Sequence, residues 1–83
     1  MTAIEILPID GGWMLRSDAV AGALVFRSGA SAESAAIRLA QGFAGAGTDA
    51  SISIYIRDGS LAQRLTVPAL GFTRLREPAR ELA

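Results

Sequence analysis

Residues 51–57 alternate strictly between isoleucine and polar or aromatic side chains, and this pattern constrains the fold more than any other feature of the chain. It predicts a strand with one apolar face, because successive side chains of a strand point to opposite sides of a sheet. Asp58-Gly59 follows, a pair favoured in two-residue hairpin turns. We therefore expect a hairpin in which Ile56 opposes Leu61 and Ile54 opposes Gln63. As a polar residue on the core face, Gln63 is expected near a sheet edge or with a hydrogen-bond partner.

The N-terminal part predicts a second hairpin and a third strand. Residues 4–9 alternate over a stretch rich in β-branched side chains, and Asp10-Gly11-Gly12 supplies the positive φ angles of a tight turn. The return strand is expected over residues 13–16, and the small and polar residues 17–22 are expected to end it. Residues 23–26 form a short apolar run that predicts another strand.

A helix is predicted from about Ala32 to Ala44. Ser31 is the expected N-cap, and Glu33 is expected in the first turn, where a carboxylate meets the positive end of the helix dipole. The apolar face is mostly alanine, which favours close packing on a sheet. Its members are Ala36, Ile37, Leu39, Ala40, Phe43 and Ala44. The run Gly45-Ala46-Gly47 supplies a residue that can end the helix in the left-handed conformation.

The predicted element order is β-β-β-α-β-β, which indicates an α+β fold with a mostly antiparallel sheet and one helix on one face. We expect a single domain over residues 1–67 and a C-terminal tail over residues 68–83, because Pro68 cannot donate to a sheet ladder. Leu70 and Phe72 in the tail are expected to pack on their own domain or across a subunit boundary.

Several short motifs resemble a small uncharacterised bacterial family, catalogued as domain of unknown function 2188. They are Gly11-Gly12-Trp13, Ala35-Ala36-Ile37 with Leu39-Ala40, and Arg57-Asp58-Gly59 followed by Arg64. The resemblance covers about residues 4–66 and implies the same order of elements. It implies no activity, since the family has no accepted one. Residues 67–72 are mostly apolar, whereas such domains tend to finish on polar residues.

The composition excludes several kinds of chemistry. The 83 residues include no cysteine and no histidine, so disulfides, thiolate and imidazole catalysis and the usual zinc sites are ruled out. Four aspartates lie in predicted turns, where their side chains commonly accept hydrogen bonds from the backbone. These are Asp10, Asp18, Asp49 and Asp58. We therefore expect a protein that is not an enzyme and that needs no cofactor and no metal.

No segment predicts targeting or membrane insertion. The N-terminus lacks the basic region of a signal peptide and is interrupted by Glu5 and Asp10. The glycine-rich residues 42–47 follow the predicted helix, whereas a phosphate-binding loop precedes one. A cytoplasmic protein is expected, with no membrane contact.

The face of the sheet away from the predicted helix carries the candidate interaction residues. The candidate interaction surface combines strand residues of this face with two apolar residues of the tail. Its members are Leu7, Met14, Val25, Tyr55, Arg57, Arg64, Leu70 and Phe72. Trp13, with the opposite parity, is expected to be a core residue. One interpretation is single-stranded nucleic-acid binding, with bases stacked on Tyr55 beside Arg57 and Arg64.

The other interpretation of this surface is self-association, as a homodimer, or docking of a protein partner. The formal net charge is zero, and Glu5 opposes Arg16 on the same face, so little surplus charge is available for phosphates. A hydrophobic fraction of 51% is high for so short a chain and leaves apolar surface for a partner. We therefore expect association and treat nucleic-acid binding as the alternative.

Overall fold

Strand β1 lies at the centre of a five-stranded sheet in the computed structural model, which describes residues 1–69. The elements are β1 (Thr2–Ile9), β2 (Gly12–Ser17), β3 (Val20–Phe26), α1 (Gly29–Gly45), β4 (Ala50–Tyr55) and β5 (Leu61–Val67). The predicted element order and the α+β class are confirmed. The predictions for Leu70 and Phe72 lie outside the described residues.

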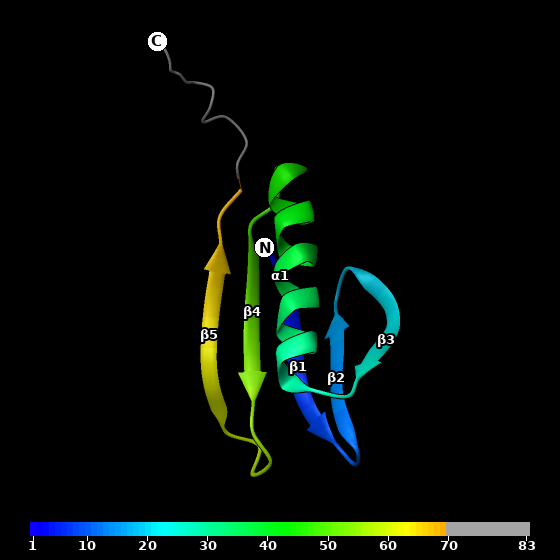
Figure 1. Cartoon of the computed structure of the whole chain (residues 1–83). Helices are drawn as coiled ribbons and strands as arrows, with labels where there is room; N and C mark the ends of the chain where they lie inside the picture. The colour runs from blue at the N-terminus through cyan, green and yellow to red at the C-terminus, as the bar shows by residue number, and fades with distance from the viewer. Residues whose placement is uncertain (70–83) are drawn as a thin grey trace.

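The spatial order of the strands is β3-β2-β1-β4-β5, which makes β3 and β5 the two edges (Figure 1). Three neighbouring pairs are antiparallel, whereas β1 and β4 run parallel, with Ile4 opposite Ile52. The sheet is therefore mixed. Helix α1 lies between β3 and β4 in the chain and provides the long connection that lets β4 return beside β1.

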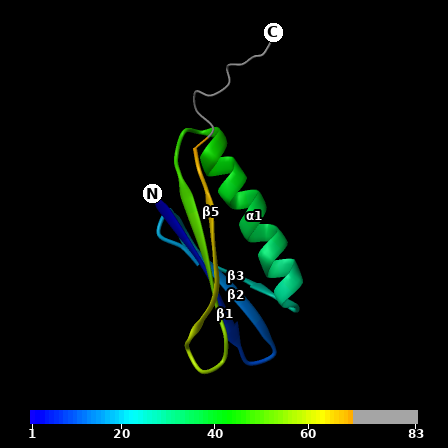
Figure 2. The same ribbon diagram turned by 90° about the vertical axis from the view of Figure 1, so that its left-hand side faces the viewer.

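Within residues 1–69, helix α1 covers one face of the sheet and the other face is uncovered (Figure 2). Its fully buried residues recur every four positions and are all alanine: Ala32, Ala36, Ala40 and Ala44. Such small side chains let the helix backbone approach the sheet closely. The largest side chains buried beneath it are Ile4, Ile6 and Ile52. Within the described residues, no helix is long and apolar enough to cross a membrane.

The helix begins three residues earlier than predicted. Ser28 is the N-cap, and its side-chain Oγ accepts a hydrogen bond from the Ser31 N–H at 3.1 Å. Ser31 as the cap was therefore wrong, and Glu33 lies beyond the first turn. The added turn packs against Trp13, since a Cβ built on Gly29 would lie 3.3 Å from Trp13 Cε2.

The first two hairpins share strand β2. The tight turn at Asp10-Gly11 is confirmed, with Ile9 opposite Gly12. The predicted loop over residues 17–22 was wrong, because β2 continues through Ser17 and β3 begins at Val20. The turn between them is anchored on β1 through Asp18. The pairing register shifts within this hairpin, beside Gly22, whose φ is +84°.

The pairing register of the β4–β5 hairpin agrees with the prediction away from the turn but differs next to it. Ile54 opposes Gln63, as expected, and Gln63 lies exposed on the edge strand β5. Nearer the turn, Tyr55 opposes Leu61, so the expected pairing of Ile56 with Leu61 was wrong. Strand β5 ends directly before Pro68, where the sequence predicts the end of pairing.

The turn of this hairpin is longer than the predicted one by one residue. The Gly59 N–H donates to the Ile56 carbonyl at 2.9 Å, and the Ile56 N–H donates to the Ser60 carbonyl at 3.0 Å. Gly59, at φ +87°, then occupies the left-handed position that ends a three-residue loop. Asp58 supports the loop, since hydrogen bonds from the Ser60 hydroxyl and N–H hold the pKa of its carboxyl below the ordinary value.

Candidate functional site

The uncovered face of the sheet carries the predicted strand residues of the interaction surface. Leu7 opposes Met14, and Met14 opposes Val25, so the three side chains form a row across β1, β2 and β3. Leu7, Met14 and Tyr55 are half-buried, whereas Val25 is 66% exposed. The row is therefore most accessible at its β3 end.

The arginines of this face are largely engaged within the domain. Arg16 Nε donates to Glu5 Oε1 at 2.7 Å, and Arg64 Nε donates to Ser53 Oγ at 3.2 Å. Arg57 lies in the hairpin loop, not on the strand where alternation placed it. Tyr55 and Arg57 line a common hollow of about 350 Å³, but Arg64 does not. The structure thus brings together only part of the predicted nucleic-acid platform.

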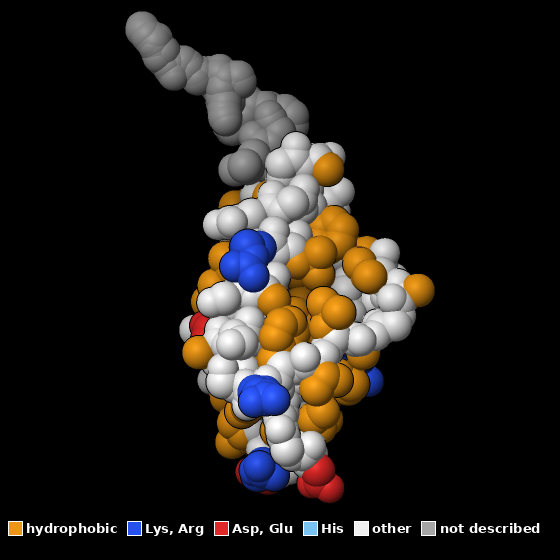
Figure 3. All heavy atoms as spheres, turned by 45° about the vertical axis from the view of Figure 1, so that its right-hand side comes forward, with side chains coloured by type: hydrophobic (Ala, Val, Ile, Leu, Met, Phe, Trp, Pro, Cys, Tyr) orange, Lys and Arg blue, Asp and Glu red, His pale blue; other side chains and the backbone are white. Residues whose placement is uncertain are grey.

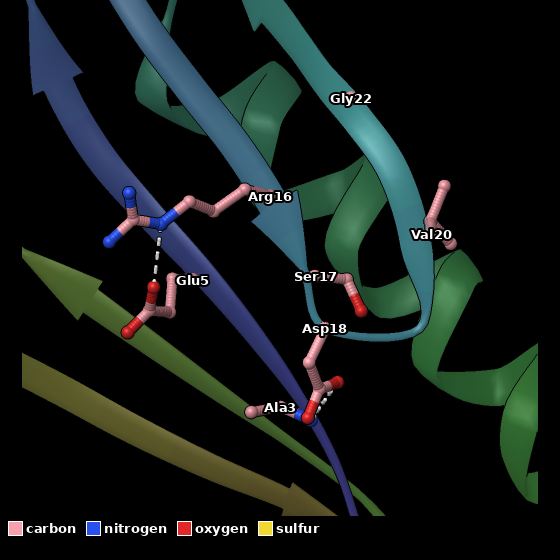
Figure 4. Close-up of a pocket in the computed structure, with 7 residues that line it drawn as sticks. All are labelled: Ala3, Glu5, Arg16, Ser17, Asp18, Val20 and Gly22. Atoms are coloured by element: carbon pink, nitrogen blue, oxygen red, sulfur yellow. Dashed lines mark hydrogen bonds and ion pairs between the residues drawn. The ribbon is translucent and has the colours of Figure 1, made fainter.

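A second hollow, of about 470 Å³, lies on this face near the β2–β3 turn (Figure 4). Glu5 and Arg16 point toward one another across it, and Asp18 reaches the start of β1. Asp18 Oδ1 accepts a hydrogen bond from the Ala3 N–H at 3.1 Å. Both carboxylates therefore have structural partners. Within residues 1–69, no three acidic side chains gather where they could hold a metal ion.

Edge strand β3 carries three exposed large apolar side chains, more than any other strand within residues 1–69. Val20, Leu24 and Val25 are 48%, 57% and 66% exposed, and the strand contains neither a charged residue nor proline. An exposed apolar edge of this kind is a template for pairing with another strand. Strand parity in the sequence predicts Val25 at this surface but not Val20 or Leu24, because the position of β3 at an edge depends on how the strands assemble.

An apolar groove of about 200 Å³ runs between β3 and α1. It is lined by the buried Leu15 on β2, the half-buried Leu39 on α1 and the exposed Leu24 on β3. Figure 3 shows hydrophobic side chains gathered between the helix and this edge of the molecule. The groove is large enough for an apolar side chain, since engineered cavities of about 150 Å³ hold small hydrocarbons.

Two backbone hydrogen bonds establish which backbone groups of β1 face which neighbouring strand. The Ala3 carbonyl accepts from the Asp18 N–H at 3.3 Å, on the β2 side. The Thr2 N–H donates to the Asp49 carbonyl at 2.9 Å, on the β4 side. Because backbone groups alternate in direction along a strand, odd-numbered residues of β1 bond toward β2.

The same alternation continues into β3. Met14 opposes an odd-numbered residue of β1, so its backbone groups point toward β1, and those of Leu15 point toward β3. Leu15 opposes Leu24, whose backbone groups are therefore used within the sheet. The N–H and C=O groups of Ala23 and Val25 point outward from the edge. They present two donors and two acceptors beside the exposed Leu24.

The opposite edge of the sheet differs in its chemistry. Strand β5 contains Gln63 and Arg64 and is followed by Pro68. Charged residues and proline at an edge disfavour pairing with another strand. Leu61 is an exposed apolar residue of this edge, at 44%. Strand β3 is thus the better of the two edges for binding a partner.

No family model, curated protein or solved structure matches the chain. The resemblance to the family catalogued as domain of unknown function 2188 stays a prediction.

Proposed function

We propose that this chain is a non-enzymatic protein-interaction domain that binds a partner strand along β3. The observation that carries the proposal is the edge itself, where the outward backbone groups of Ala23 and Val25 lie beside the exposed side chain of Leu24. A strand added to such an edge gains affinity from main-chain hydrogen bonds and specificity from alternate side chains.

The groove between β3 and α1 defines the kind of partner that fits. Its lining side chains include Leu15, Leu24 and Leu39, so an apolar residue on the helix side of the added strand would be covered there. On the other side of the edge, Val25 continues the apolar row of Leu7 and Met14. A strand with apolar residues on both faces suits this site better than an acidic or basic peptide.

The acidic side chains support the non-enzymatic part of the proposal. Glu5 accepts a hydrogen bond from Arg16, Asp18 from Ala3, and Asp58 from Ser60. Each contact holds a turn or a pair of strands together. These carboxylates serve the fold and are not arranged as a pair for acid–base chemistry.

The alternative is single-stranded nucleic-acid binding at Tyr55, Arg57 and Arg64. The shared hollow of Tyr55 and Arg57 supports it, but the internal hydrogen bonds of Arg16 and Arg64 limit the charge available for phosphates. A fluorescent single-stranded oligonucleotide separates the two functions. Binding that weakens with salt and is lost in Tyr55→Ala favours the alternative, whereas no binding at low salt removes it.

A fluorescent peptide that copies residues 18–28 tests the proposed function directly. We expect the peptide to bind the full-length protein and to slow hydrogen exchange at the Ala23 and Val25 amides, which point outward at the edge. Leu24→Glu should abolish binding, because it places a charge in the apolar groove.

The matched control is Leu61→Glu, which introduces the same charge at the opposite edge. We expect this variant to bind the peptide as the unmodified protein does. A monomeric protein that fails to bind the peptide, or a peptide whose binding is lost in Leu61→Glu but kept in Leu24→Glu, would show that β3 is not the interaction edge.

A further inference from the structure

We propose that the strand bound along β3 is the β3 strand of a second copy of this chain, paired antiparallel about a two-fold axis at Leu24. This inference rests on the proposed function and names its partner. The pairing joins two sheets into one continuous sheet. The two α1 helices then lie on the same face, because a two-fold axis perpendicular to a sheet keeps each face on its own side.

The backbone groups of β3 are complementary to themselves in this register. Ala23 and Val25 lie on either side of Leu24, and both point their N–H and C=O groups outward. When Leu24 opposes Leu24 of the partner, Ala23 of each copy opposes Val25 of the other. Every outward donor of these residues then meets an outward acceptor, and four hydrogen bonds form.

The irregular stretch of β3 around Gly22 favours a register centred on Leu24 over one centred on Ala23. The pairing with β2 is regular over residues 23–26 and shifts on the N-terminal side, where Gly22 has a φ of +84°. A ladder centred on Ala23 would include Ala21 and Gly22, which lie in the irregular stretch. A ladder centred on Leu24 places its four hydrogen bonds entirely within the regular one.

The side chains and charges of β3 also match a second copy. Leu24 protrudes on the helix side beside the apolar groove, so the two-fold axis places each Leu24 at the rim of the other groove. The strand itself is uncharged, with Asp18 before it and Arg27 after it. In the Leu24 register, antiparallel pairing places Arg27 of each copy opposite the uncharged Ala21 of the other. Parallel pairing would place like charges together.

Pairing of β3 with the β5 edge of another copy is disfavoured. That contact joins two different edges, so it leaves one of each unpaired and continues into an open filament. It would also bring Arg64 and Gln63 to the uncharged strand β3. The two-fold pairing of β3 with itself closes after two copies. The strand edges that it leaves exposed are those of β5, where Arg64 and Pro68 disfavour further pairing.

Cysteine cross-linking tests the register. The chain contains no cysteine, so Leu24→Cys introduces a single thiol. In the proposed dimer the two copies of this position form a non-hydrogen-bonded pair, with Cα atoms about 4.5 Å apart, which is within the range of a disulfide. We expect mild oxidation to convert the full-length variant almost completely to a disulfide-linked dimer.

Val25→Cys is the matched control, since it moves the thiol by one residue to a more exposed position, 66% against 57%. Strand spacings place its two copies about 8 Å apart, beyond the limit of about 7 Å for a disulfide. We expect little cross-linking. Efficient cross-linking of Val25→Cys, or equal cross-linking of both variants, would overturn the register.

Sedimentation equilibrium of the unmodified chain separates failure of this inference from failure of the proposed function. A dimer whose dissociation constant rises in Leu24→Glu supports the inference. A chain that stays monomeric yet binds the peptide of residues 18–28 overturns it and leaves the interaction edge intact, with another protein as partner. A chain that is monomeric and also fails to bind the peptide overturns both.

Discussion

Leu24→Ala measures how much the exposed leucine of β3 contributes to association. Complete burial of a leucine side chain is worth about 1.5 to 3 kcal/mol, and in the single chain 57% of Leu24 remains exposed. Covering that part contributes about 0.9 to 1.7 kcal/mol per copy, and two copies meet at the axis. The loss of about 1.7 to 3.4 kcal/mol raises the dissociation constant of the dimer about 20- to 300-fold.

Sedimentation equilibrium over a range of protein concentrations supplies this dissociation constant. Leu61→Ala is the matched control, because Leu61 is similarly exposed at 44% but lies on the opposite edge strand. We expect its dissociation constant to equal that of the unmodified chain. Circular dichroism of both variants should show an unchanged fold, since each leucine is already largely exposed.

The reasoning is refuted if Leu61→Ala weakens the dimer as much as Leu24→Ala does. Equal effects would mean that association depends on general surface hydrophobicity and not on strand β3. A dimer that is unaffected by Leu24→Ala would place the interface on another surface, such as the row formed by Leu7, Met14 and Val25.

The remaining predictions concern the fold. Ile52→Ala, at a fully buried position, should lower the free energy of unfolding in urea by about 2 to 5 kcal/mol, and a loss under 1 kcal/mol would contradict the observed core. Gly12→Ala should destabilise by about 1 to 3 kcal/mol, because its Cβ would collide with the Phe26 carbonyl oxygen, whereas Gly42→Ala, which meets nothing within 4 Å in the helix, should stabilise by up to about 1 kcal/mol. Because the folded pKa of Asp58 is depressed, its stabilisation is present above the ordinary pKa and is lost as the pH falls through the folded value. Unfolding of Ser60→Ala should therefore depend less steeply on acid pH than that of the unmodified chain, and identical profiles would contradict the role of the Ser60 hydroxyl.

Local patterns were sufficient to predict most of the secondary structure. The alternation of isoleucines predicted β4 and its pairing of Ile54 with Gln63, and the spacing of alanines predicted the buried face of α1. The errors arose where two local solutions fit the same residues. Ser28 and Ser31 are both good N-caps, and Asp58-Gly59 suits a three-residue loop as well as a two-residue turn.

The candidate site could be predicted only in part, because it depends on which strands become edges. Val25 was placed on the uncovered face by strand parity, and its pairing with Met14 agrees. Leu24 was not selected, since parity alone places it beneath the helix. The parallel pairing of β1 with β4 makes β3 an edge, and α1 then leaves Leu24 exposed. Strand order is a tertiary property that hairpin motifs do not encode.

Hydrogen exchange at the individual amides of β3 tests the central claim most directly. Leu24 and Phe26 bond to β2 in the single chain, so their amides should exchange slowly at every protein concentration. The Ala23 and Val25 amides point outward, and they should exchange rapidly in dilute protein and slowly once the dimer forms. If the Ala23 and Val25 amides remain rapidly exchanging at concentrations where sedimentation shows a dimer, β3 is not the strand that pairs.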